Sequence, residues 1–305
     1  MASRRGTGLS GRRRILRRAF KVDGTIECEI DSLSSPQAQA EATAGAAEPE
    51  RKGKMAAVVV LCHGQWSSKY DPLLMALSEG ILRDERALDD GDGVEVVRFT
   101  FGARFTEPFS GYDKEKVELL RVIGHLERVM GKTVRCVLGH SKAATVVCLA
   151  LGELSVGGER IGAACISGRF DMSRGVERSV GRGIVQAVMA GDPQLVTVSK
   201  TTQPFWLTRE RLEERAAIDM GRAIATMSQN VSGNGLKVCF LVAHGESDER
   251  IPISDALAYA RAFRERGDEA EVHLIPGADH CFSSPGHRDQ LVGRVAAFVH
   301  GTVLR

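Results

Sequence analysis

A serine at the centre of a turn built from small residues is the feature of this chain with the clearest chemical potential. The turn is Gly139-His140-Ser141-Lys142-Ala143, and it lies between the apolar run 134–138 and a helix-like segment, 143–150. Strand, sharp turn and helix are the setting of a nucleophile elbow, in which strained backbone exposes the serine hydroxyl above the sheet edge. Small neighbours are needed there because strand and helix nearly touch. A serine that only caps the helix is the competing interpretation.

Two later segments supply an acid and a base for such a serine. The apolar run 236–243 is typical of a buried strand, and Asp248 lies just past its end. His280 lies on the loop after the next predicted strand, near 271–275. Catalytic groups in open parallel sheets gather at this edge. Three strand ends therefore place the three required residue types in the order serine, aspartate, histidine, which indicates nucleophilic catalysis more strongly than the turn alone.

A loop after an earlier predicted strand, near 56–62, begins His63-Gly64-Gln65. Acyl transfer needs two hydrogen-bond donors aimed at the oxyanion that develops in the transition state. We expect the backbone N–H groups of Gln65 and Lys142 to be these donors. Gly64 would let the chain pass close to the substrate.

With these motifs the chain resembles α/β-hydrolases of the serine aminopeptidase-like (hydrolase 4) group, and more closely plant and microbial hydrolases similar to feruloyl and cinnamoyl esterases. Six blocks spread over residues 55–300 carry the resemblance: VVLCHGQWSSKYDP, VLGHSKAATVV, ISGRFDMSRG, LTRERLEERAAIDM, HGESDERIP and GADHCF. The resemblance implies cleavage of small-molecule carboxylic esters through an acyl-enzyme, without metal or organic cofactor. It assigns the nucleophile, acid, base and two oxyanion donors to Ser141, Asp248, His280, Gln65 and Lys142.

Two stretches depart from the pattern of that family. Ala143-Ala144 stand where its members usually carry Gly-Gly, and extra methyl groups at the elbow would tighten or shift it. The loop 100–108 also lacks the usual Gly-x-Gly-x-Ser pattern. That loop normally borders the site, so the substrate preference stays open.

Further residues near the predicted site are candidates for substrate contact: His63, Gly64, His140, Phe205 and Trp206. For the two histidines, shaping or orienting the backbone is the expected role. For the two aromatic residues, pinning a lid to the core is favoured over contact with substrate. Asp279 is interpreted as a turn residue rather than the acid, and a Ser-Lys dyad is disfavoured because adjacent elbow residues point apart.

The same triad would serve a peptidase or a thioesterase, so the sequence separates these activities poorly. A small-molecule receptor without catalysis is an alternative of a different class, because an intact triad does not exclude it. Epoxide hydrolases and dehalogenases on this fold are disfavoured, since they carry Asp where Ser141 stands.

The alternation of predicted strands and helices indicates an α/β-hydrolase fold, a mostly parallel twisted sheet flanked by helices, with an inserted helical lid. Predicted strands near 94–99 and 161–167 and a helix near 114–130 belong to this rhythm, and a charged helix is expected over 208–220. We divide the chain into a disordered basic tail (1–14), an edge hairpin and flexible connector (15–54), the first half of the core (55–168), the lid (169–235) and the second half of the core (236–305).

Composition fits one large soluble enzyme domain. The chain has 305 residues, of which 43% are hydrophobic, and no apolar run approaches the roughly 18 residues of a membrane span. The seven cysteines show no metal-like spacing and are expected to be mostly buried, reduced thiols, which favours a reducing compartment.

The net charge of +2 hides an uneven distribution. Eight basic residues precede Asp23, and removing them from the total of 41 leaves 33 basic against 39 acidic residues. Only the tail would favour nucleic acid, so no nucleic-acid partner is expected. A cytoplasmic location is predicted, with a plastid or mitochondrion as the alternative if the Arg-rich start is a transit segment. The sequence leaves the oligomeric state open.

Overall fold

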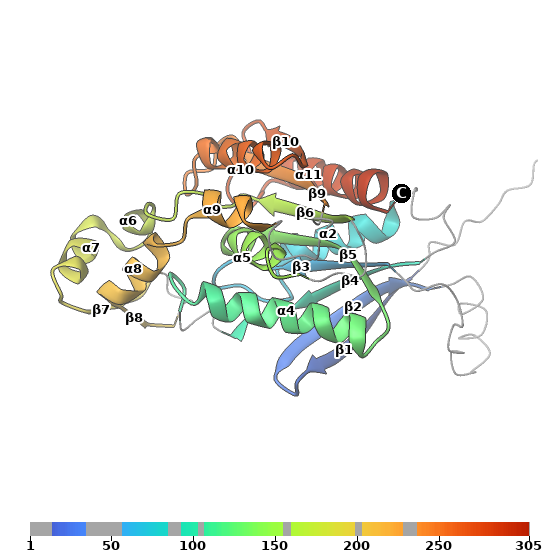
Figure 1. The fold of residues 1–305 in the computed structure, drawn as a ribbon, viewed down its shortest axis with the longest axis horizontal. Helices are drawn as coiled ribbons and strands as arrows, with labels where there is room; N and C mark the ends of the chain where they lie inside the picture. The colour runs from blue at the N-terminus through green and yellow to red at the C-terminus, as the bar shows by residue number, and fades with distance from the viewer. Residues whose placement is uncertain are drawn as a thin grey trace, which may run out of the picture.

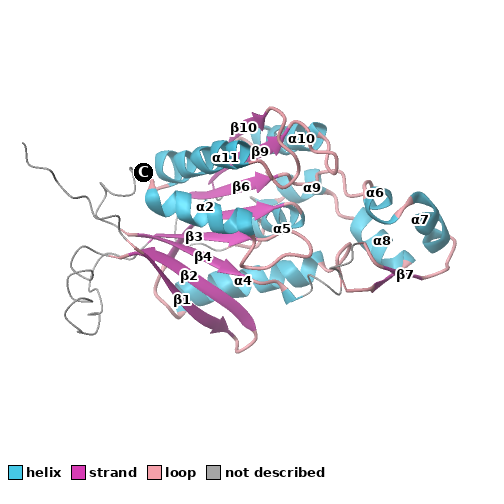
Figure 2. Cartoon of the chain, turned by 180° about the vertical axis from the view of Figure 1, so that it is seen from behind, coloured by secondary structure: helices cyan, strands magenta, loops and turns pink. Residues whose placement is uncertain are grey.

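The computed structural model describes residues 14–34, 57–84, 93–102, 107–154, 160–198, 203–227 and 237–304. Residues 1–13 of the predicted tail and residues 35–54 of the predicted connector lie outside these ranges. Residues 103–106 of the loop 100–108 also lie outside them. Figures 1 and 2 show one large sheet with helices on both of its faces.

The sheet has eight strands in the order β1-β2-β4-β3-β5-β6-β9-β10. Their bounds are Ile15–Val22, Ile26–Leu33, Ala57–Cys62 (β3), Val94–Phe99 (β4), Thr133–His140 (β5), Arg160–Ile166 (β6), Lys237–Gly245 (β9) and Glu269–Ile275 (β10). All pairs from β4 to β10 are parallel, and the two strands of the hairpin join them antiparallel. The mostly parallel sheet flanked by helices is therefore confirmed.

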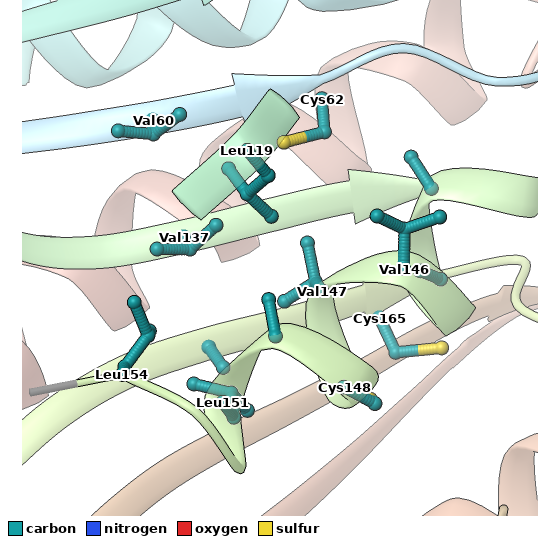
Figure 3. Close-up of a cluster of buried hydrophobic side chains, with 14 of the residues drawn as sticks. Val60, Cys62, Leu119, Val137, Val146, Val147, Cys148, Leu151, Leu154 and Cys165 are labelled. Carbon is teal, nitrogen blue, oxygen red and sulfur yellow. The ribbon is translucent and has the colours of Figure 1, made fainter. Parts of the chain in front are cut away.

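Helices cover the two faces as two separate hydrophobic layers. One face carries α4 (Tyr112–Arg128), α5 (Lys142–Leu151), α9 (Met220–Ala225) and α10 (Ile253–Glu265), and the other carries α2 (Pro72–Arg83) and α11 (Pro285–Phe298). Figure 3 shows α5 laying Val146 and Val147 over Val137 of β5 and Val60 of β3. The short π-helical turn Val299–Val303 follows α11. Because the core continues beneath α5 on several strands, this helix has little freedom to move.

The helix predicted near 114–130 is present, but it ends two residues early. Leu119, Ile123 and Leu126 are buried under α4, which stops at Arg128. Met130 lies beyond the helix and packs against the same core while only partly buried.

The hairpin at the sheet edge is fixed to the rest of the fold by a buried ion pair. The guanidinium of Arg98 on β4 donates to both carboxylate oxygens of Asp31 on β2, each at 3.0 Å, and to the carbonyl of Lys69. Ser78 of α2 donates to Asp31 as well, at 2.5 Å. Arg98 thus joins the hairpin to the loop that follows β3, which is the predicted oxyanion loop.

Residues 169–227 form an insertion between β6 and β9 that projects from one end of the sheet (Figure 1). It contains α6 (Val176–Val180), α7 (Arg182–Met189), α8 (Arg209–Ala216) and a two-stranded antiparallel sheet, β7 (Gln194–Val196) and β8 (Phe205–Leu207), before α9 returns to the core. The insertion has an apolar cluster of its own. The prediction of one continuous helix over 208–220 is wrong, because Asp219 caps α9 by accepting the Arg222 N–H at 2.9 Å.

Six of the seven cysteines are buried, but Cys281 is exposed. Core packing was the expectation for Cys281, and its place on a surface loop after β10 explains the difference. In the described parts of the chain, no helix is both long and apolar enough to span a bilayer, and no cluster of three or more His, Cys, Asp or Glu side chains could hold a metal ion.

Replacing Asp31 with alanine should lower the free energy of unfolding by about 3 kcal/mol, because it removes two of the hydrogen bonds of the buried Arg98 guanidinium and leaves Glu29 as its one carboxylate partner. Urea denaturation measures the change. The matched control is Glu79→Ala, which breaks an exposed ion pair with Arg83 on α2 and should have little effect. Equal losses in the two variants would contradict this account of the hairpin.

Candidate active site

The backbone at Ser141 is strained, as a nucleophile elbow requires. Ser141 links β5 to α5 with φ 57° and ψ −119°, a conformation that residues with a side chain rarely adopt. Its N–H donates to the carbonyl of Ile166 at 2.8 Å. A Cβ at Gly139 would lie 2.3 Å from the carbonyl oxygen of Ala143, so only glycine fits where strand and helix meet.

One of the two alanines that depart from the family pattern, Ala144, is accommodated by a glycine in the loop after another strand. A Cβ at Gly168, just after β6, would lie 2.6 Å from the Cβ of Ala144. The methyl group of Ala144 is therefore buried where residue 168 has no side chain. Gly168, which lies outside the motif, therefore makes room for the added methyl group at the elbow.

The structure brings Ser141, His280 and Asp248 together in one hydrogen-bonded line. His280 Nε2 lies 2.9 Å from Ser141 Oγ, and His280 Nδ1 lies 2.8 Å from Asp248 Oδ2. The other oxygen, Asp248 Oδ1, accepts the N–H groups of Arg250 at 2.8 Å and Ile251 at 2.9 Å. Each of the three side chains stands on a loop or turn at the carboxyl end of a parallel strand, which is why residues more than 100 positions apart meet.

The charges around the line favour an ionised acid. Burial raises the pKa of Asp248, but the hydrogen bond and charge of His280 and the two backbone N–H groups outweigh it, so the pKa lies below its usual value. The carboxylate is therefore ionised at neutral pH and can stabilise a positive His280.

His140 is a neutral support for the base rather than a second base. Burial, followed by the nearby charge of His280, lowers the pKa of His140 to about 4. Its Nε2 lies 3.0 Å from the backbone carbonyl of His280, so the neutral ring donates there and fixes the loop that carries the base.

His63 holds the predicted oxyanion loop. The Phe101 N–H donates to His63 Nε2 at 3.0 Å, so Nδ1 carries the hydrogen and donates to the carbonyl of Gly64 at 2.7 Å. In a trans peptide the following N–H points opposite to that carbonyl, so the N–H of Gln65 faces away from His63. A Cβ at Gly64 would lie 3.2 Å from Ser141 Cβ, which places this loop against the nucleophile.

The side chain of Lys142 points away from the chemistry. Its ammonium is buried and donates to Glu115 Oε1 at 2.7 Å, the Ser110 carbonyl at 2.8 Å and the Glu107 carbonyl at 3.0 Å. All three donors are used, so the side chain has no role in a dyad with Ser141. It instead ties the elbow to the loop 107–111 ahead of α4.

The two aromatic residues predicted in the lid lie differently. Phe205 is buried and its ring centroid lies 5.8 Å from that of Phe109, which in turn lies 5.9 Å from that of Trp66 beside the oxyanion loop. Trp206 is 56% exposed, so the expectation that it pins the lid to the core is wrong. Side chains alternate along β8, and with Phe205 and Leu207 turned inward Trp206 must face outward.

Asp279 lies next to the base but takes no part in the line. Its side chain is exposed and accepts the Ser283 N–H at 2.8 Å, as the turn interpretation expected. Four further residues shape the site and are not among the candidates predicted from the sequence: Trp66, Phe109, Glu115 and His244. The adjacency of Trp66 to Gln65 was a usable signal, whereas the other three are recognisable only from tertiary contacts.

Comparisons with known proteins bear on the fold and on the second half of the chain. The model of the prolyl oligopeptidase family matches residues 185–303, which include Asp248 and His280 but begin after Ser141. No curated protein matches the chain.

Solved structures match almost the whole length of the chain. Est1E from Butyrivibrio proteoclasticus superposes with a TM-score of 0.61 at 15% identity, covering 95% of this chain and 99% of that one. An esterase domain from Rhodothermus marinus gives 0.58 at 16%, covering 94% and 98%. A dienelactone hydrolase from Anabaena variabilis gives 0.53 at 12%, covering 95% and 99%. The chain has the α/β-hydrolase fold. At these identities the superpositions establish the α/β-hydrolase architecture and no more.

Replacing Gly139 with alanine should lower the free energy of unfolding by about 3 kcal/mol, since the added Cβ meets backbone that cannot shift cheaply. The matched control is Gly183→Ala in α7, where a Cβ meets nothing within 4 Å. Denaturant titration of both variants measures the difference. A Gly139→Ala protein as stable as the Gly183→Ala protein would mean that strand and helix do not approach this closely.

Proposed function

We propose that this chain is a serine hydrolase that cleaves carboxylic esters of small molecules through an acyl-enzyme intermediate. The observation that carries the proposal is the continuous line from Ser141 Oγ through His280 to the ionised Asp248, with separations of 2.9 and 2.8 Å. Nucleophile, base and orienting acid within hydrogen-bond reach are the geometry of covalent catalysis.

The proposed reaction has two halves. His280 donates through Nδ1 to Asp248, so Nε2 is free to take the Ser141 proton as the hydroxyl oxygen attacks the ester carbonyl. The backbone N–H groups of Gln65 and Lys142 stabilise the oxyanion. His280 then gives the proton to the departing alcohol, and afterwards activates the water that releases the acid.

The solved structures favour esters. Two of the structural neighbours are described as esterases or esterase domains, and Est1E has also been solved with ferulic acid bound. The insertion, residues 169–235 as predicted, is proposed to act as a lid, because its apolar cluster meets the oxyanion loop through Trp66.

Peptide or amide cleavage is the second candidate, and the match to the prolyl oligopeptidase family over 185–303 favours it. A panel of p-nitrophenyl esters, acyl-CoA thioesters and aminoacyl amides separates the activities by their kcat/KM values. Turnover below about one per hour on every member, together with tight ligand binding, would favour a receptor, since enzymes are typically far faster.

Asp248→Asn should lower kcat by roughly 10⁴, because the neutral amide neither holds the correct His280 tautomer nor stabilises the imidazolium. The matched control is Asp279→Asn, one residue before the base, which should leave kcat close to that of the unaltered protein. Steady-state kinetics on the best ester give both numbers.

Ser141→Ala should abolish both turnover and labelling by a fluorophosphonate probe. Full esterase activity in Ser141→Ala would falsify the assignment.

A further inference from the structure

His244 is a fully buried histidine at the carboxyl end of β9 that touches the loop of the candidate acid. Its Nε2 lies 2.9 Å from the backbone carbonyl oxygen of Ile251 and 3.4 Å from Asp248 Oδ2. A carbonyl oxygen only accepts, so Nε2 carries the hydrogen. Nδ1 is buried and has no hydrogen-bond partner in the described structure, so Nε2–H is the one ring group that donates a hydrogen bond.

That donor closes the loop on which Asp248 stands. The loop leaves β9 at Gly245, and the Asp248 N–H donates back to the Gly245 carbonyl at 3.1 Å. At its other end the Ile251 N–H donates to Asp248 Oδ1 at 2.9 Å, while the Ile251 carbonyl accepts from His244. Ile251 is thus held through both its N–H and its carbonyl, and the Asp248 carboxylate is held with it.

The same N–H lies beside the oxygen that His280 uses. Asp248 Oδ2 has His280 Nδ1 at 2.8 Å and His244 Nε2 at 3.4 Å. A neutral donor near a carboxylate oxygen stabilises its charge and weakens its pull on a neighbouring imidazolium. His244 therefore bears on both the place and the basicity of the acid.

Packing alone is a poor explanation for this histidine. Leaving Nδ1 buried without a partner costs on the order of 1–3 kcal/mol, a cost that an apolar side chain of similar size would not carry. The histidine differs from such an apolar side chain in supplying the Nε2–H donor.

We propose that His244 is a positioning residue for the Asp248–His280 pair, acting through Nε2–H on the loop 245–251 and on Asp248 Oδ2. This inference rests on the proposed hydrolase function. It concerns how the acid is held and how strongly it supports the base, and His244 itself touches no substrate.

Two substitutions test the role of the donor. In His244→Gln the side-chain amide nitrogen reaches about as far as Nε2 does and keeps the bond to Ile251. In His244→Asn the shorter amide reaches only about as far as Nδ1, so a polar group stays but the donor is lost. His244→Leu removes the polarity altogether.

We expect His244→Asn and His244→Leu to lower kcat roughly tenfold or more, with KM nearly unchanged, because a displaced acid misorients the base. The acid limb of kcat/KM should also move up by about 0.5 pH unit, because Asp248 without this donor holds a proton on His280 more strongly. His244→Gln should stay close to the unaltered protein in both measures.

Other titratable or charged groups lie around the same pair and are left in place in every variant: His140, Arg169, Asp279 and Cys281, with Asp71 and Arg250 next to them. Any difference between the Asn and Gln variants therefore reports on the donor alone. If His244→Leu does not fold, the Asn and Gln pair decides the question.

Asn and Gln variants with the same kcat and the same acid limb would overturn the inference and leave His244 a packing residue. Failure of the proposed function looks different, because the unaltered protein would then neither turn over any ester of the panel nor take up the fluorophosphonate probe. The probe reaction, with Ser141→Ala as its blank, is therefore run first.

Discussion

The close approach of β5 and α5 at Ser141 is the constraint on which the rest of the structure depends. The chain must turn from strand to helix within one strained residue, and the missing side chain at Gly139 is what lets the Ala143 carbonyl lie where it does. Strain of this kind persists only when its surroundings hold it in place. Here they do so from three sides: the core beneath α5, the absent side chain of Gly168, and the bond from the Ser141 N–H to β6.

Asp248 and His280, the proposed acid and base, stand at the same sheet edge, and two histidines hold their loops in place. His140 donates to the backbone of His280, and His244 donates to the backbone of the Asp248 loop. Both supporting rings stand at strand ends, and both are buried. The loops that carry the chemistry are thus fixed by side chains from the strands, so little of the geometry is left to the loops themselves.

Much of this arrangement could be predicted from the sequence, because local patterns encode it. Continuous apolar runs mark the buried strands that precede Ser141 and Asp248, whereas His280 follows the partly buried edge strand β10, in which apolar and polar residues alternate. Roles that depend on distant contacts could not be found this way. The side chain of Lys142 forms hydrogen bonds with α4 and with the loop before that helix. The break in the charged helix depends on how Asp219 caps α9. Trp206 faces outward because β8 pairs with β7 within the insertion. A strand of three residues is too short for its sequence pattern to predict this pairing.

The loop 107–111 makes the insertion part of the nucleophile's surroundings. Lys142 holds two of its carbonyls from below, Phe109 packs between Trp66 and Phe205, and the Gly111 N–H donates to Glu214 of α8 at 3.2 Å. Moving the loop 107–111 would remove two carbonyl acceptors from the buried Lys142 ammonium, which costs free energy where water cannot replace them. The distal part, α7 with β7 and β8, carries no such bond to the elbow among the described contacts, and Leu195 and Trp206 there are exposed. The distal part can therefore move at a lower cost in free energy than the loop 107–111, which the Lys142 ammonium holds against the elbow.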